Sequence, residues 1–126
     1  MSLYQAILLD HFKHPRRAGV LPVYTFSCFE NNPLCGDEIM VYGLVQNGKL
    51  VERSFTGTGC VISQATASLL LDSNLVDDVA QIASLGAQDV LELIGMEQLG
   101  PNRLKCALLP LIALQRGLIE GSWVDE

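Results

Sequence analysis

The sequence contains no long apolar run, no surplus of positive charge and no export signal. No segment approaches the roughly 20 apolar residues that a membrane-spanning helix requires. Eight Lys and Arg residues stand against 14 Asp and Glu residues, so the net charge is -6. Residues 1–4 include no basic region before an apolar stretch. These absences argue against a membrane protein and against nucleic-acid binding through a broad basic surface. They predict a cytoplasmic protein, whose thiols stay reduced.

Histidine is also scarce, and this limits the chemistry of the cysteines. The two histidines, His11 and His14, both lie in the N-terminal segment, in a different motif from every cysteine. A cysteine hydrolase needs a histidine close to its thiol, so that class of enzyme is disfavoured. The two histidines are three residues apart, a spacing that can bind metal, but no cysteine accompanies them. We interpret them as cap or partner-surface residues.

The length and composition predict a single domain covering residues 1–126. Apolar residues make up 49% of the chain, which is enough for a core without disulfide support. No change in composition marks a linker between domains.

The order of the predicted elements indicates an α+β fold. Apolar spacing predicts a first helix over residues 3–12, and His14-Pro15 should end it. Strand formers predict three strands over residues 23–29, 38–45 and 49–55. Asn47-Gly48 joins the last two strands and suits a type I′ hairpin turn. Helices are expected over residues 62–75, 77–83, 88–94 and 103–116. We therefore expect a three-stranded antiparallel sheet with helices packed on one face.

Three of the four cysteines, together with one aspartate, form the most informative set. Cys35, Cys60 and Cys106 are each predicted in a turn or at a helix start, where a thiolate can be exposed and reactive. With Asp37 they offer three sulfur ligands and one weaker oxygen ligand, a set that suits a zinc or iron ion. Cys28 instead falls within an alternating strand and is interpreted as core packing.

The first two motifs can each bring a ligand to the site. In Cys35-Gly36-Asp37 the two flanking side chains point the same way if the segment is extended. An ordinary Gly-Asp turn with a chance cysteine is the alternative. In residues 57–60 the glycines allow close backbone approach, and the following helix start favours a thiolate at Cys60. A phosphate-binding loop is excluded because no Gly-Lys-Ser/Thr ending follows.

The third motif places cations beside a cysteine. Arg103 and Lys105 flank Cys106, and nearby positive charge stabilises a thiolate. Lys105 can also act as a movable neighbour of a bound metal or persulfide. The alternative is that Cys106 is a small, buried helix residue.

Taken together, these motifs resemble the IscU/SufU/NifU-type iron–sulfur cluster assembly scaffolds. The similarity covers nearly the whole chain and rests on four segments in order, namely residues 4–19, 32–37, 57–65 and 103–106. It implies a SufE/NifU-like fold, with Cys35, Asp37, Cys60 and Cys106 holding zinc, iron or a transient [2Fe–2S] cluster. It also implies three partners: a cysteine desulfurase, an iron donor and acceptor apoproteins.

The chain departs from the family pattern in two places. Lys105 stands where IscU members carry histidine. Residues 99–103 also lack the Leu-Pro-Pro-Val-Lys motif, which argues against recruitment of the Hsp70-type chaperone. The motif around Cys106 looks like the SufU branch, whereas the short spacing between Cys60 and Cys106 fits IscU.

Three functions therefore stand as hypotheses. The first is a scaffold that is not an enzyme and that assembles and passes on clusters. The second is a zinc-dependent sulfur acceptor of SufU type, for which Cys106 is slightly preferred over Cys60 as the acceptor. The third is a structural zinc domain with buried, unreactive cysteines.

Overall fold

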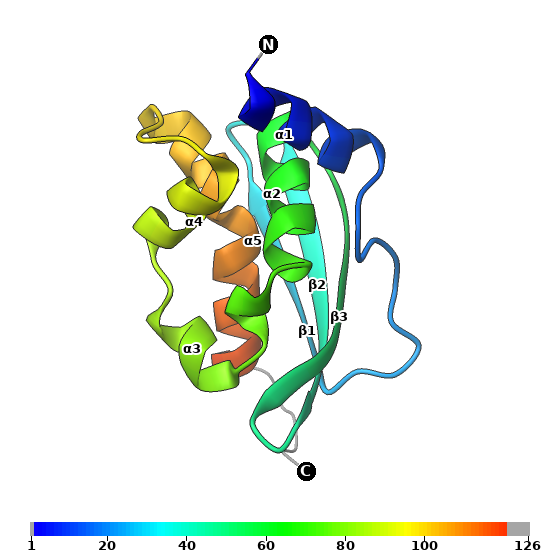
Figure 1. The fold of residues 1–126 in the computed structure, drawn as a ribbon. Coiled ribbons are helices and arrows are strands. Elements are labelled where there is room, and N and C mark those ends of the chain that lie inside the picture. Colours follow the sequence, from blue (N-terminus) through cyan, green and yellow to red (C-terminus); the bar gives the residue numbers. More distant parts are fainter. Residues whose placement is uncertain (1, 121–126) are drawn as a thin grey trace.

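The chain begins with a helix, continues into a three-stranded sheet and ends in a helical half (Figure 1). The computed structural model describes residues 2–120. In chain order the elements are α1 (Leu3–Lys13), β1 (Phe26–Asn32), β2 (Asp37–Gln46), β3 (Lys49–Thr58), α2 (Val61–Leu71), a 3₁₀ turn η1 (Asn74–Val76), α3 (Val79–Ser84), α4 (Ala87–Ile94) and α5 (Pro101–Glu120). The predicted α+β order is confirmed.

The sheet is antiparallel in the order β1-β2-β3. Asn47 and Gly48 have φ angles of 54° and 75°, the positive values that the predicted type I′ turn requires. Strand β1 begins at Phe26, three residues later than predicted, and continues to Asn32. Before it, the Thr25 hydroxyl donates to the Gly43 carbonyl and accepts from the Val45 N–H. The Thr25 backbone N–H also donates to the Gly43 carbonyl at 2.8 Å, so Thr25 bonds β2 through both its backbone and its side chain.

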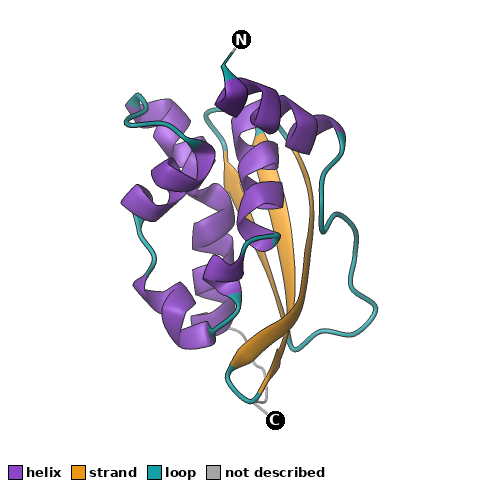
Figure 2. Ribbon diagram, viewed as in Figure 1, coloured by secondary structure: helices purple, strands orange, loops and turns teal. Residues whose placement is uncertain are grey.

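The helices cover one face of the sheet (Figure 2). Helix α5 packs on β1 and β2, and α2 packs on β3 and α5. Alternate residues of β2 point into this layer, and Ile39, Val41 and Val45 are completely buried. Leu114 of α5 is likewise completely buried. One continuous core between sheet and helices therefore holds the ends of the strands in place.

Helix α1 ends at Lys13, as His14-Pro15 predicts, and packs on α2. Ser68 of α2 makes the polar link, because its Oγ lies 2.7 Å from His11 Nδ1 and accepts the Arg16 N–H at 2.8 Å. The following segment then runs beside β3, with backbone hydrogen bonds between Gly19 and Phe55 and between Phe55 and Arg17. Helix α1 is therefore fixed to the same elements that carry the Cys60 motif.

Helix α2 ends at Leu71, so the predicted helix over residues 62–75 is too long. The buried guanidinium of Arg53, on β3, donates to the carbonyls of Leu71 and Ser73 at 2.8 Å and 3.0 Å. These carbonyls lie where the helix stops, and Ser73 caps the separate 3₁₀ turn that follows. A contact from another element thus sets the end of α2.

Helix α5 is longer than predicted, since it begins at Pro101 and runs through Pro110 to Glu120. Proline suits the first turn of a helix, where its missing N–H has no helical partner. Pro110 lies in the interior, so the carbonyl of Cys106 lacks the N–H that residue 110 would otherwise donate. Within residues 2–120, no helix combines the length and apolar character needed to cross a membrane.

Candidate metal centre

The three cysteine motifs meet at one end of the molecule, the upper end in Figure 1. The β1–β2 loop carries Cys35, and Asp37 is the first residue of β2. Cys60 is the N-cap residue of α2. Cys106 lies in the second turn of α5, which starts at this same end. The β1–β2 loop and the starts of α2 and α5 therefore bring together residues that are far apart in the sequence.

Three of the four predicted ligands form a compact group. The ligand atoms of Cys35, Asp37 and Cys106 all lie within 4.8 Å of one another. Cys60 is outside this group of three but is joined to it through Asp37. Its Sγ lies 3.6 Å from Asp37 Oδ2, and its backbone N–H donates to Asp37 Oδ1 at 2.8 Å. The Asp37 carboxylate is thus the common neighbour of the thiols.

Burial divides these four residues into two pairs. Asp37 is 0% exposed and Cys106 is 3% exposed, whereas Cys35 and Cys60 are exposed. The buried pair belongs to a strand and to a helix interior. The exposed pair occupies a loop and a helix cap. One side of the candidate centre is therefore closed by the fold and the other is open to solvent.

The expectation of an exposed thiolate at Cys106 is wrong. Burial raises the pKa of the Cys106 thiol, and the hydrogen bonds and negative charge from neighbouring Asp37, Cys35 and Cys60 raise this pKa further. The metal-free chain therefore holds Cys106 as a protonated thiol. A metal ion that binds the Cys106 sulfur must displace this proton.

Gly59 allows the close approach of Asp37 to the start of α2. Its φ angle is 141°, and a Cβ at this position would lie 2.2 Å from Asp37 Oδ1. Any side chain here would therefore clash with the carboxylate, and the positive φ angle would strain the backbone of any residue other than glycine. The expectation that glycines in residues 57–60 permit close approach is confirmed at this residue.

Three polar residues near the ligands have no role in the sequence-based predictions. Ser63 is buried and donates to the Cys60 carbonyl at 3.2 Å, and Gln64 donates to Ser63 Oγ at 3.1 Å. Asn32 is buried beside Cys106, with Nδ2 3.7 Å from its Sγ. The Asn-Pro pair is a turn signal that indicates a side chain bonded to its own loop. It gives no sign of the contact with Cys106, a residue 74 positions away.

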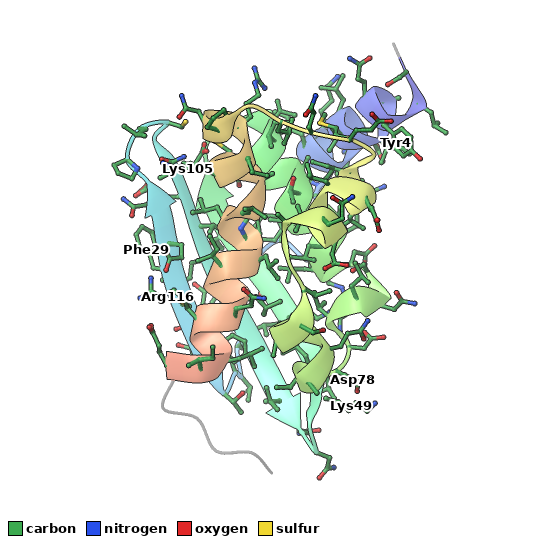
Figure 3. The ribbon with its side chains drawn as sticks, turned by 90° about the vertical axis from the view of Figure 1, so that its left-hand side faces the viewer. Tyr4, Phe29, Lys49, Asp78, Lys105 and Arg116 are labelled. Atoms are coloured by element: carbon green, nitrogen blue, oxygen red, sulfur yellow. The ribbon has the colours of Figure 1, made fainter. Side chains whose placement is uncertain are left out.

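The predicted neighbour Lys105 is exposed, and with Leu34 and Ile112 it lines a groove between the β1–β2 loop and α5. Figure 3 shows it near the start of α5. Cys28 is half-buried and packs against Gly117 of α5, in agreement with its interpretation as packing. His11 bonds Ser68 and thereby joins two helices.

Comparison with known proteins identifies relatives over almost the whole chain. Residues 3–121 match the family described as NifU-like N terminal domain. The zinc-dependent sulfurtransferase SufU of Bacillus subtilis is 31% identical, over 93% of this chain and 90% of that protein. The iron–sulfur cluster assembly scaffold protein IscU of Streptococcus pyogenes is 30% identical, over 92% and 82%. A crystal structure of a putative scaffold protein for the SUF system from Fervidobacterium islandicum superimposes with a TM-score of 0.73, at 26% identity over 94% and 96% of the two chains.

Proposed function

The chain belongs to the NifU-like N-terminal domain family, and from this premise we propose that it is a scaffold for iron–sulfur cluster assembly. In this role residues 1–126 act as one domain. The domain receives sulfur from a cysteine desulfurase and iron from an iron donor, and it passes a [2Fe–2S] cluster to acceptor apoproteins. The cluster is cargo, so the protein is not an enzyme in this step. The chemistry needs reduced thiols, which suits the cytoplasm.

The observation that carries the proposal is the donor set at the upper end of the sheet. Cys35, Asp37 and Cys106 place their ligand atoms within 4.8 Å of one another, and Cys60 approaches through Asp37. Three sulfur atoms and one carboxylate suit iron and zinc. Carboxylate oxygen is a weaker ligand than thiolate for cluster iron, so a cluster held by this set is exchangeable.

The exposed pair supports transfer of cargo in both directions. Cys35 and Cys60 are exposed, so a desulfurase or an acceptor protein can reach their sulfurs without unfolding the domain. Cys106 and Asp37 are buried and remain attached to the core. The departure from the chaperone motif at residues 99–103 leaves an Hsp70-type chaperone outside the proposed partners.

A second candidate function is zinc-dependent sulfur acceptance, favoured by the 31% identity to a protein named as a SufU sulfurtransferase. The exposed Cys60 suits this role better than Cys106, which reverses the preference drawn from the sequence. The Cys60 thiolate would attack the outer sulfur of the desulfurase persulfide. A new S–S bond then forms on Cys60, the old S–S bond breaks, and the desulfurase cysteine leaves as a thiolate.

Anaerobic reconstitution separates these functions. The protein is incubated with desulfurase, cysteine, ferrous iron and a thiol reductant. Electrons from this reductant and from the oxidation of iron reduce the persulfide sulfur to sulfide. Absorption spectra and metal and sulfide analysis follow. The scaffold proposal predicts equal amounts of protein-bound iron and sulfide, with the absorption of a [2Fe–2S] cluster. Cys28→Ser should retain the cluster, and Cys106→Ser should lose it.

Two other results would replace the scaffold proposal. Strong stimulation of desulfurase turnover by the zinc-loaded, iron-free protein, without any bound cluster, would establish the sulfur acceptor. Zinc binding with neither cluster nor stimulation would leave a structural zinc domain.

A further inference from the structure

We propose that Asn32 is a positioning residue for Cys106, and that its side-chain N–H donates a hydrogen bond to the Cys106 sulfur in the metal-bound site. This inference rests on the proposed metal-binding function. It assigns a role to a residue that is not itself among the proposed ligands.

The orientation of the Asn32 amide follows from its own loop. Asn32 is 7% exposed, and its Oδ1 accepts the backbone N–H of Leu34 at 3.2 Å. A backbone N–H is a donor only, so the amide oxygen must be the atom that faces Leu34. The amide nitrogen therefore faces the other way, where Cys106 Sγ lies at 3.7 Å.

Asn32 also organises the loop that carries Cys35. Its backbone carbonyl accepts the N–H groups of Cys35 and Gly36 at 3.1 Å and 2.9 Å. In the sheet it pairs with Asp37 across the β1–β2 ladder. One residue thus contacts the Cys35 loop, the strand position of Asp37 and the sulfur of Cys106, and so fixes their relative positions.

The contact with Cys106 also has an electronic consequence. The groups near this sulfur include the Asp37 carboxylate and the Cys35 thiol, which bring negative charge to the site when they bind metal. An amide N–H is a neutral donor that withdraws electron density from a thiolate, and hydrogen bonds to ligand sulfur tune metal affinity and reduction potential. Asn32 therefore offsets part of the charge that accumulates around Cys106.

Two substitutions separate this bond from the loop contact. Asn32→Asp keeps an oxygen for the Leu34 N–H but removes the N–H donor, whereas Asn32→Leu removes both. Asn31→Asp is the matched control, because Asn31 is the exposed neighbour on β1 and the change in charge is the same. Circular dichroism and thermal unfolding verify that each variant is folded.

Cobalt(II) titration of the metal-free proteins is the test. We expect both Asn32 variants to bind cobalt about tenfold more weakly, as loss of a hydrogen-bonding neighbour of a ligand typically does. Their sulfur-to-cobalt charge-transfer band should move to longer wavelength, because the thiolate has lost a donor. Asn31→Asp should match the wild type in both measurements.

The possible results distinguish this inference from the proposed function. An unchanged band and affinity in Asn32→Asp, with weakening only in Asn32→Leu, would overturn it, since Asn32 would then act through its loop alone. Unchanged binding in both Asn32 variants would also overturn it while leaving the metal site intact. Failure of the wild type to bind cobalt through thiolates would overturn the proposed metal site itself.

Discussion

The two halves of the candidate centre differ in how they are built. Asp37 and Cys106 are buried on a central strand and inside a long helix, whereas Cys35 and Cys60 are exposed on a loop and at a helix cap. The buried half is fixed by the same packing that stabilises the core. The exposed half is accessible from solvent without any change in that packing. In the proposed function the exposed thiols give other proteins access to the site, and the buried half, which includes the weaker ligand Asp37, sets how firmly a metal or cluster is held.

The largest expected effect is the loss of the contact between Asp37 and the start of α2, which joins the two halves of the centre. Gly59→Ala should cause this loss, because the added Cβ would lie 2.2 Å from Asp37 Oδ1 at a φ angle of 141°. We expect a loss of about 2 kcal/mol or more in the free energy of unfolding, since the backbone strain adds to the clash. Urea denaturation measures it, and cobalt binding should fall in parallel.

Gly86→Ala is the matched control for this substitution. Nothing lies within 4 Å of the position where its Cβ would be, and its φ angle is not positive. It should change the free energy of unfolding by about 0.5 kcal/mol or less. Equal stability of Gly59→Ala and Gly86→Ala would show that Asp37 does not depend on the close approach at Gly59.

Thiol alkylation rates compare the exposed cysteines with the buried Cys106. In the metal-free protein at pH 8, iodoacetamide should modify Cys35 and Cys60 at least about tenfold faster than Cys106, because each unit of raised pKa lowers the thiolate fraction about tenfold. Burial both raises the pKa of Cys106 and shields its sulfur. Peptide mass spectrometry over a time course gives the individual rates. Similar rates for Cys106 and Cys60 would remove the distinction between the two halves.

The smallest expected effect is on the pH dependence of the free energy of unfolding, through His11 of α1, which contacts Ser68 of α2. Burial lowers the pKa of His11 from its ordinary value of 6.5. The unfolded chain therefore binds this proton more readily than the folded chain, and stability present above pH 6.5 is lost as the pH falls. We expect the free energy of unfolding to be lower at pH 5.5 than at pH 7.5, with His11 contributing less than about 1 kcal/mol because it is only partly buried.

Urea denaturation at the two pH values checks this contribution. His11→Gln should reduce the difference between them, and His14→Gln, at the exposed end of α1, should preserve it. If the two variants have the same pH dependence as the wild type, the His11–Ser68 link does not couple to protonation.

Local signals predict the elements and motifs well. Asn47-Gly48 identifies the hairpin because its turn needs two positive φ angles, which these residues tolerate. His14-Pro15 predicts the end of α1 from backbone sterics alone. Cys35-Gly36-Asp37 identifies a candidate ligand pair, but the extended backbone expected there is wrong, because Gly36 lies in a turn with a φ angle of 72°.

Contacts between distant elements are the part that the sequence does not reveal. The burial of Cys106 depends on how α5 lies on β1 and β2, so its neighbours Arg103 and Lys105 suggest the wrong environment. The end of α2 depends on Arg53 from β3. The contact between Asn32 and Cys106 joins residues 74 positions apart. None of these contacts follows from helical or strand periodicity.

The most direct test is the rate at which reconstituted protein passes its cluster to an apo-ferredoxin, compared between the wild type and Asp37→Ala. The Asp37 carboxylate supplies the weaker ligand and adds negative charge beside the thiolates. We therefore predict that Asp37→Ala retains the cluster and transfers it about tenfold more slowly, equivalent to about 1.4 kcal/mol in the barrier. Asp37→Asn, which keeps an oxygen for the Cys60 N–H, should behave like Asp37→Ala. Equal transfer rates for the wild type and both variants would show that Asp37 has no part in releasing the cluster.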